Sequence, residues 1–165
     1  MMRSDAYKYL LLLAFLLLLQ IFVFPLVQFW SISPFIYIFA ILILPAQWSV
    51  YPTLLLAFGS GLLLDFALDC PGLHTMSATL MAYLRQPVLR WAASKEALTR
   101  VSEKSLGFLA YWKYMMLLVF IHHACYFLLE SFSFLNLPVL LLKIVGSTLA
   151  SLLLMLLLER FRRAS

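Results

Sequence analysis

The chain has 165 residues, of which 65% are hydrophobic and 12% are charged, whereas soluble domains average roughly half and a quarter. This composition excludes a water-soluble globular domain. The formal charge of +5 does not indicate nucleic-acid binding, because the basic residues form short clusters beside apolar runs, where Lys and Arg set membrane topology. The whole chain, 1–165, is therefore predicted to be a single integral membrane domain. Its fold class is expected to be all-α, a polytopic membrane helix bundle.

Six apolar runs, separated by turn residues, predict about six transmembrane helices. Pro34, Pro52 and Pro138 fall where the first turn of a helix tolerates proline. The first run is too long for the core of a signal peptide and is expected to be retained. The second run is short, so it is tilted little, extends towards Gln47 and Trp48, or is partly re-entrant. The predicted spans cover residues 9–30, 34–46, 52–68, 73–91, 112–132 and 138–158.

Positive charge predicts the orientation of the bundle, since Lys and Arg near span ends are retained in the cytoplasm. With six spans, all three basic clusters fall on one side, and both termini are predicted to be cytoplasmic. The long loop from Ala92 to Tyr111 lies on that side. It is either a short interfacial helix, supported by Glu96 and Arg100 at i,i+4, or a solvated linker. The clusters are Arg3 and Lys8; Arg85, Arg90, Lys95, Arg100, Lys104 and Lys113; and Arg160, Arg162 and Arg163.

Charged side chains inside predicted spans are the first candidates for function, because charge in hydrocarbon is costly and usually paired. Asp65 lies about one turn before the outer end of the third span, and Lys143 lies one to two turns after the outer start of the sixth. Their matching depth predicts an intramembrane ion pair between Asp65 and Lys143. The alternative is that Lys143 extends to the interface and Asp65 reaches interfacial water.

Small and polar residues in the spans are interpreted first as packing residues. Gly59, Ser60 and Gly61 would let a neighbouring helix approach closely, a commoner use of small residues than a substrate path. His122 and His123 point about 100° apart on a helix, so they do not readily share a metal ion. Structural hydrogen bonding is favoured for both, as for Gln20, over proton relay or transport. The chain also carries Cys70 and Cys125 without metal-ligand spacing, and no catalytic motif. We therefore expect no catalytic site, no metal and no cofactor.

Two segments carry a resemblance to a known family. Residues 59–90, GSGLLLDFALDCPGLHTMSATLMAYLRQPVLR, contain a glycine-bearing helix, an aspartate, a Pro-Gly turn and a helix that ends in arginine. Residues 33–45, SPFIYIFAILILP, precede them. Both resemble the family of the rod shape-determining protein MreD. The residues that match its motif, beside the packing residue Gly59, are Gly61, Asp65, Pro71, Gly72, His74, Arg85 and Arg90.

The resemblance implies a non-enzymatic, multi-pass component of the bacterial cytoplasmic (inner) membrane that acts in rod elongation. Its implied partners are an MreC-like bitopic membrane protein, the MreB cytoskeleton directly or indirectly, peptidoglycan synthases and the lipid bilayer. The matching residues would hold the hairpin of the third and fourth spans and present a partner surface. The family is also similar in fold to substrate-binding subunits of vitamin transporters. A small-solute transporter subunit is therefore the alternative, by analogy of fold alone.

Overall fold

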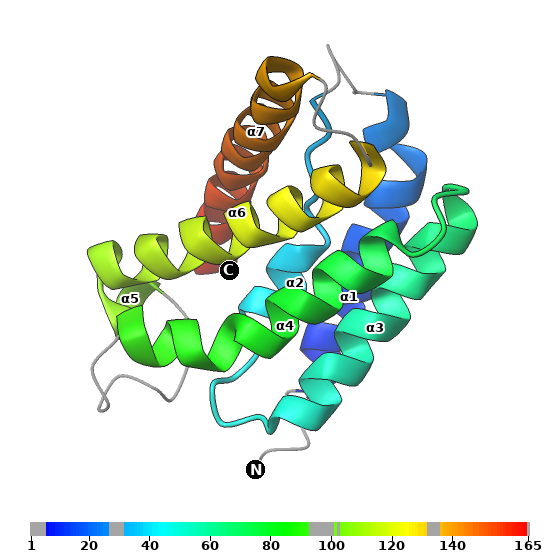
Figure 1. Ribbon diagram of the computed structural model, residues 1–165. Coiled ribbons are helices and arrows are strands. Elements are labelled where there is room, and N and C mark those ends of the chain that lie inside the picture. The colour runs from blue at the N-terminus through cyan, green and yellow to red at the C-terminus, as the bar shows by residue number, and fades with distance from the viewer. Residues whose placement is uncertain (1–5, 27–31, 93–100, 102, 132–135, 165) are drawn as a thin grey trace.

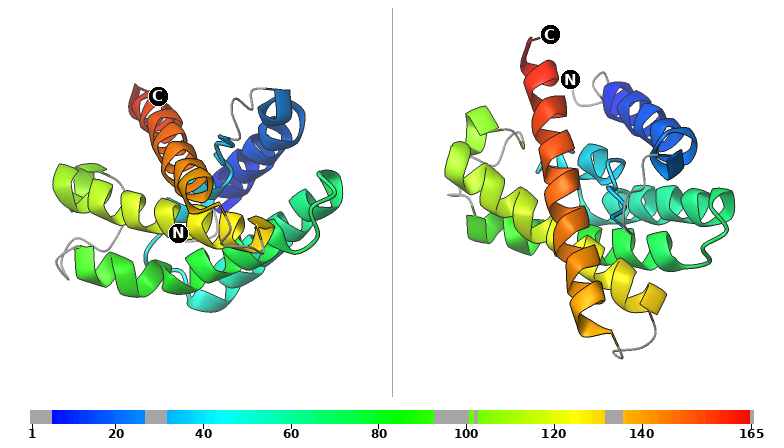
Figure 2. Two further views of the ribbon diagram at one scale, coloured as in Figure 1. Left: turned by 45° about the horizontal axis from the view of Figure 1, so that its top comes forward. Right: turned by 90° about the horizontal axis from the view of Figure 1, so that it is seen from above.

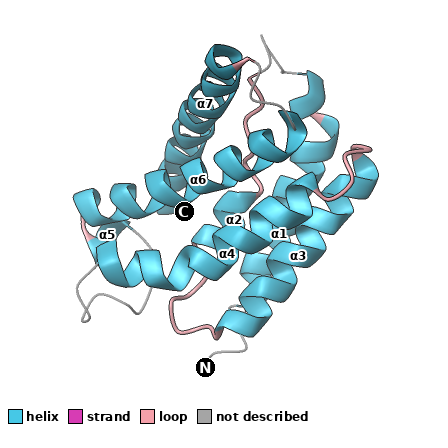
Figure 3. Cartoon of the chain, viewed as in Figure 1, coloured by secondary structure: helices cyan, strands magenta, loops and turns pink. Residues whose placement is uncertain are grey.

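The computed structural model describes residues 6–26, 32–92, 101, 103–131 and 136–164, and this part of the chain consists of helices joined by turns (Figure 3). The predicted all-α class is confirmed. Figure 1 shows α3 and α4 lying side by side as an antiparallel hairpin, and both views of Figure 2 show α7 crossing α6 obliquely. The helices are α1 Ala6–Phe22, the 3-10 helix η1 Phe24–Leu26, α2 Ile38–Leu42, α3 Val50–Ala67, α4 Leu73–Ala92, α5 Glu103–Leu106, α6 Phe108–Ser131 and α7 Leu137–Ala164.

Four stretches of helix in the described residues are long and apolar enough to cross a membrane. They correspond to the first, third, fifth and sixth predicted spans. The fourth predicted span is the helix α4, but its second half carries Arg85, Gln86 and Arg90 and is less apolar. Six spans and cytoplasmic termini therefore stay predictions. The four stretches are Ala6–Leu26, Val50–Ala67, Phe108–Ser131 and Leu137–Arg162.

Two expectations fall partly on residues outside the described part of the chain. The first predicted span, 9–30, includes residues 27–31. The loop predicted over 92–111 includes residues 93–100 and thus the pair Glu96 and Arg100. At the end of this loop α5 is a single turn, and α6 begins at Phe108, so the last residues of the predicted loop belong to a long helix.

The second predicted span is not a transmembrane helix. Of residues 34–46, only Ile38–Leu42 are α-helical, and the rest of the run lies in turns or extended backbone. No side chain from Phe35 to Leu44 is more than 3% exposed, so this run is enclosed by the other helices. An apolar run suits a lipid-facing helix and a protein-buried segment equally well, and here the surroundings are protein. We call residues 33–46 the central segment.

Side chains of α1 and α7 bond the backbone at the start of the central segment. The amide of Gln20 donates from Nε2 to the carbonyl of Pro34 at 3.2 Å and accepts the N–H of Ile36 at 2.9 Å. Two serines of α7 accept two further N–H groups, that of Ser33 at Ser147 Oγ and that of Phe35 at Ser151 Oγ, each at 2.9 Å. Non-helical backbone at membrane depth is tolerated only where such partners are supplied.

Side chains of α4 and α6 bond the end of the same segment. The hydroxyl of Tyr114 donates to the carbonyl of Leu42 at 2.8 Å. The guanidinium of Arg85 donates from Nε to the same carbonyl at 3.4 Å and from a terminal nitrogen to the carbonyl of Leu44. These carbonyls lie at the C-terminal end of the short helix α2, where a cation is favoured by the helix dipole. The buried polar residues of the bundle thus replace hydrogen bonds that a continuous helix would have made.

Candidate functional site

The turn between α3 and α4 is organised around the carboxylate of Asp65, which is 5% exposed. It accepts the backbone N–H groups of Gly72 at 3.0 Å, His74 at 2.8 Å and Thr75 at 3.0 Å, and also the Thr75 hydroxyl. The first N–H groups of a helix have no partner within that helix. Asp65 therefore caps α4 from the preceding helix, and its negative charge faces the positive end of the α4 dipole.

Glycine is required at two positions of this hairpin. Gly72 has φ +86°, in the left-handed region that only glycine adopts freely, and it follows Pro71 in the turn that leads into α4. Gly61 lies against α4 so closely that a Cβ atom there would be 2.6 Å from the Thr75 Cα. The close approach of the two backbones brings the Asp65 carboxylate within reach of the first turn of α4.

The predicted ion pair between Asp65 and Lys143 is wrong. Lys143 Nζ lies 2.7 Å from Glu130 Oε2, in a partly exposed pair between α7 and α6. The oxygens of Asp65 are instead occupied by the N–H groups of α4. Equal depth in two helices does not place them side by side, and α7 packs on α6. Lys143 therefore pairs with Glu130, which lies on the adjacent helix α6.

His123 is held in one tautomer by its two neighbours. Its Nδ1–H donates to the carbonyl of Val119 at 2.8 Å, and its Nε2 lies 3.0 Å from Ser151 Oγ. In the neutral imidazole Nε2 is then the acceptor, so the Ser151 hydroxyl donates to it while accepting the N–H of Phe35. His123 thereby supports the serine that bonds the central segment, which is the structural hydrogen bonding expected from the sequence.

His74 and His122 share the hydroxyl of Tyr37 at the centre of the bundle. Tyr37 Oη lies 2.9 Å from His122 Nε2 and 3.3 Å from His74 Nδ1. The ring of Phe35 packs edge-on against both imidazoles. Among the described residues no group of three or more His, Cys, Asp or Glu side chains is placed to hold a metal ion. Sequence reasoning missed Tyr37, since a tyrosine in an apolar run gives no sign of its partners.

The remaining predicted motif residues lie apart from this cluster. Arg85 is completely buried and bonds the central segment, although the sequence placed it at the basic end of a span. Its Nη1 has no hydrogen-bond partner among the described residues. Arg90 is exposed near the end of α4, and Gly59 faces open space on α3. Of the predicted residues, Gly61, Asp65, Pro71, Gly72 and His74 come together at the hairpin.

A cavity of about 250 Å³ lies beside this hairpin. The walls include aromatic rings and polar groups, and the Nε2 atom of His74 has no partner among the described residues. The charged residues that would mark a solute pocket in the sequence, Asp65, Glu130 and Lys143, do not line it. Its walls include Gln20, Ser33, Phe35, Cys70, His74 and Tyr126.

The thiol of Cys70, in the turn between α3 and α4, is expected to react slowly at neutral pH. Burial, and after it the adjacent Asp65 carboxylate, together raise its pKa to about 11. Only the thiolate attacks a maleimide. In a Cys125→Ala background, the labelling rate should rise about tenfold per pH unit up to pH 9.5, because the thiol stays mostly protonated. A rate that levels off near pH 8.5, the pKa of an ordinary cysteine, would contradict this environment. Free glutathione serves as the parallel control.

No protein-family model matches this chain, and neither the curated proteins nor the solved structures give a match. The candidate site is therefore interpreted from its own geometry.

Proposed function

We propose that this chain is a non-enzymatic component of the bacterial rod-elongation machinery in the cytoplasmic membrane. It would act as a scaffold between an MreC-like bitopic membrane protein, the MreB cytoskeleton and lateral peptidoglycan synthesis. The observation that carries the proposal is the use made of the residues that resemble the MreD family. Gly61, Asp65, Gly72 and His74 converge on the α3–α4 hairpin, where the contacts of the first three build the fold.

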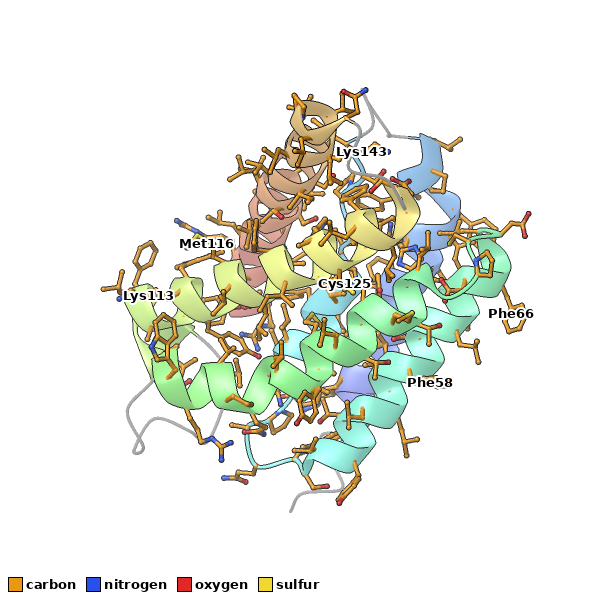
Figure 4. The ribbon with its side chains drawn as sticks, in the orientation of Figure 1. Phe58, Phe66, Lys113, Met116, Cys125 and Lys143 are labelled. Atoms are coloured by element: carbon orange, nitrogen blue, oxygen red, sulfur yellow. The ribbon has the colours of Figure 1, made fainter. Side chains whose placement is uncertain are left out.

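The hydrogen bonds made by the buried polar side chains also support a scaffold. Gln20, Arg85, Ser147 and Ser151 each bond the backbone of the central segment. A protein that works through its surfaces needs a rigid interior and broad outer faces, and these bonds supply the first. The outer face of α3 is strongly apolar, and Figure 4 shows Phe58 and Phe66 pointing away from the bundle. Such a face suits lipid or a partner helix.

The second candidate is a solute-binding membrane subunit, favoured by the cavity beside the hairpin. Small-molecule sites are concave, with apolar walls and a few polar groups, and Phe35, His74 and Tyr126 supply both kinds of wall. The cavity volume of about 250 Å³ is below the usual range for ligand pockets, roughly 300–1,000 Å³. We therefore rank this function second.

Depletion of the protein in its native host tests both functions. If the chain is a morphogenetic scaffold, depleted cells become round and insert new wall material at dispersed sites, as seen by fluorescent labelling of nascent wall. A plasmid copy should restore cell width, and a copy with Asp65→Asn, which weakens the hairpin, should restore it poorly. Unchanged width and unchanged insertion sites would reject the scaffold, and solute uptake by the same depleted cells would then test the second candidate.

A further inference from the structure

A long groove runs between α6 and α7, on a part of the bundle away from the α3–α4 hairpin. Its volume is about 510 Å³, and it is lined by α6 and α7 together with Trp91 from the end of α4. Its walls are apolar except at Lys113 and Thr148. Figure 4 shows Lys113 and Met116, which both line the groove, on the part of α6 that adjoins α5. The groove therefore has a charged end and an apolar length.

The charged end has the features of a headgroup site. Lys113 is exposed and has no salt-bridge partner among the described residues. Trp91 lies at the same groove, and Arg90 precedes it as a second exposed cation. Tryptophan marks the level of lipid headgroups, and basic pockets between transmembrane helices bind anionic lipid headgroups. The charge at this end is complementary to a phosphate.

The volume of the groove matches one lipid chain. At about 30 Å³ for each water-sized group, 510 Å³ holds roughly 17 methylene-sized groups, the size of one acyl chain. One acyl chain therefore fits the groove.

We propose that the groove between α6 and α7 is a specific site for an anionic phospholipid. One acyl chain lies along Met116 and Leu149, and the phosphate pairs with Lys113. The site does not depend on the function proposed above, since it uses none of the residues of the hairpin.

The experiment is native mass spectrometry of the delipidated full-length chain in detergent, titrated with phosphatidylglycerol or with phosphatidylcholine of the same chains. We expect the wild type to retain one phosphatidylglycerol in preference to phosphatidylcholine. Lys113→Gln should weaken retention of phosphatidylglycerol about fivefold, the effect expected of one basic residue at a membrane surface, and should abolish the preference. Lys143→Gln is the matched control, because Lys143 pairs with Glu130 and does not line the groove.

A further variant tests the apolar part of the site. Leu149→Trp fills the groove from an exposed position and should displace the lipid without unfolding the chain, as checked by circular dichroism. Equal retention of the two lipids by the wild type would overturn the proposal and indicate lipid at the general protein surface only. Retention unchanged by both Lys113→Gln and Leu149→Trp would overturn it as well.

Discussion

Replacing Asp65 by asparagine is expected to lower the free energy of unfolding by about 3 kcal/mol, because a charged acceptor of three backbone N–H groups is lost. The asparagine side chain keeps one oxygen but turns an NH₂ group towards N–H donors of α4, with which it cannot bond. The favourable interaction of the carboxylate with the α4 dipole disappears at the same time. Some N–H groups of the first turn of α4 are then left without partners.

Thermal unfolding in detergent, followed by circular dichroism of the helices, measures this loss. A change of about 3 kcal/mol in a chain of this size corresponds to a fall in Tm on the order of 10 °C. Asp69→Asn is the matched control. Asp69 is exposed on the same turn, and its φ of +51° is one that asparagine also tolerates. Equal melting temperatures for the two variants would show that Asp65 does not hold the hairpin.

A methyl group at Gly61 is expected to be at least as damaging. The Cβ of Gly61→Ala would lie 2.6 Å from the Thr75 Cα and 2.7 Å from its nitrogen. Both atoms belong to the backbone of α4, so no side chain can rotate away, and α3 and α4 must separate. Overpacking typically costs 1–3 kcal/mol. We expect about 3 kcal/mol here, because separation of the helices also lengthens the bonds from Asp65 to α4.

The control for this variant is Gly59→Ala. Gly59 lies on the same helix, but a Cβ there meets nothing within 4 Å. Alanine is favoured over glycine in a helix by up to about 1 kcal/mol, so Gly59→Ala should leave the melting temperature unchanged or raise it slightly. The same thermal measurement compares the two. If Gly61→Ala had the same melting temperature as Gly59→Ala, the close contact of α3 and α4 would be refuted.

The helical class and the long apolar helices follow from the sequence, because hydropathy and length act locally along the chain. The central segment does not. Residues 34–46 are apolar throughout, and apolar side chains pack equally well against lipid and against protein. What separates the two cases is the fate of the backbone, and its partners Gln20, Tyr114 and Ser151 lie in three other helices. The sequence of residues 34–46 itself gives no indication of these partners.

The candidate site shows the same limit. The motif residues from Gly61 to His74 could be selected from the sequence, since a glycine, an aspartate and a Pro-Gly turn at short spacing indicate a tight hairpin. The bonding of Asp65 to N–H groups seven to ten residues later depends on how closely the two helices approach. The depth of a residue in its helix likewise does not tell which helices are neighbours, so the sequence does not predict that Lys143 pairs with Glu130.

The hydrogen bonds between the central segment and α7 have a consequence for the order in which the protein folds during synthesis. Ser147 and Ser151 lie 114 and 116 residues after the N–H groups that they accept. At a synthesis rate of 5–20 residues per second, those groups wait on the order of ten seconds before their partners exist. During that interval the segment has no stable place in hydrocarbon in its final shape. The central segment, although it is translated early, therefore completes its fold only after the last helix, α7, has been inserted.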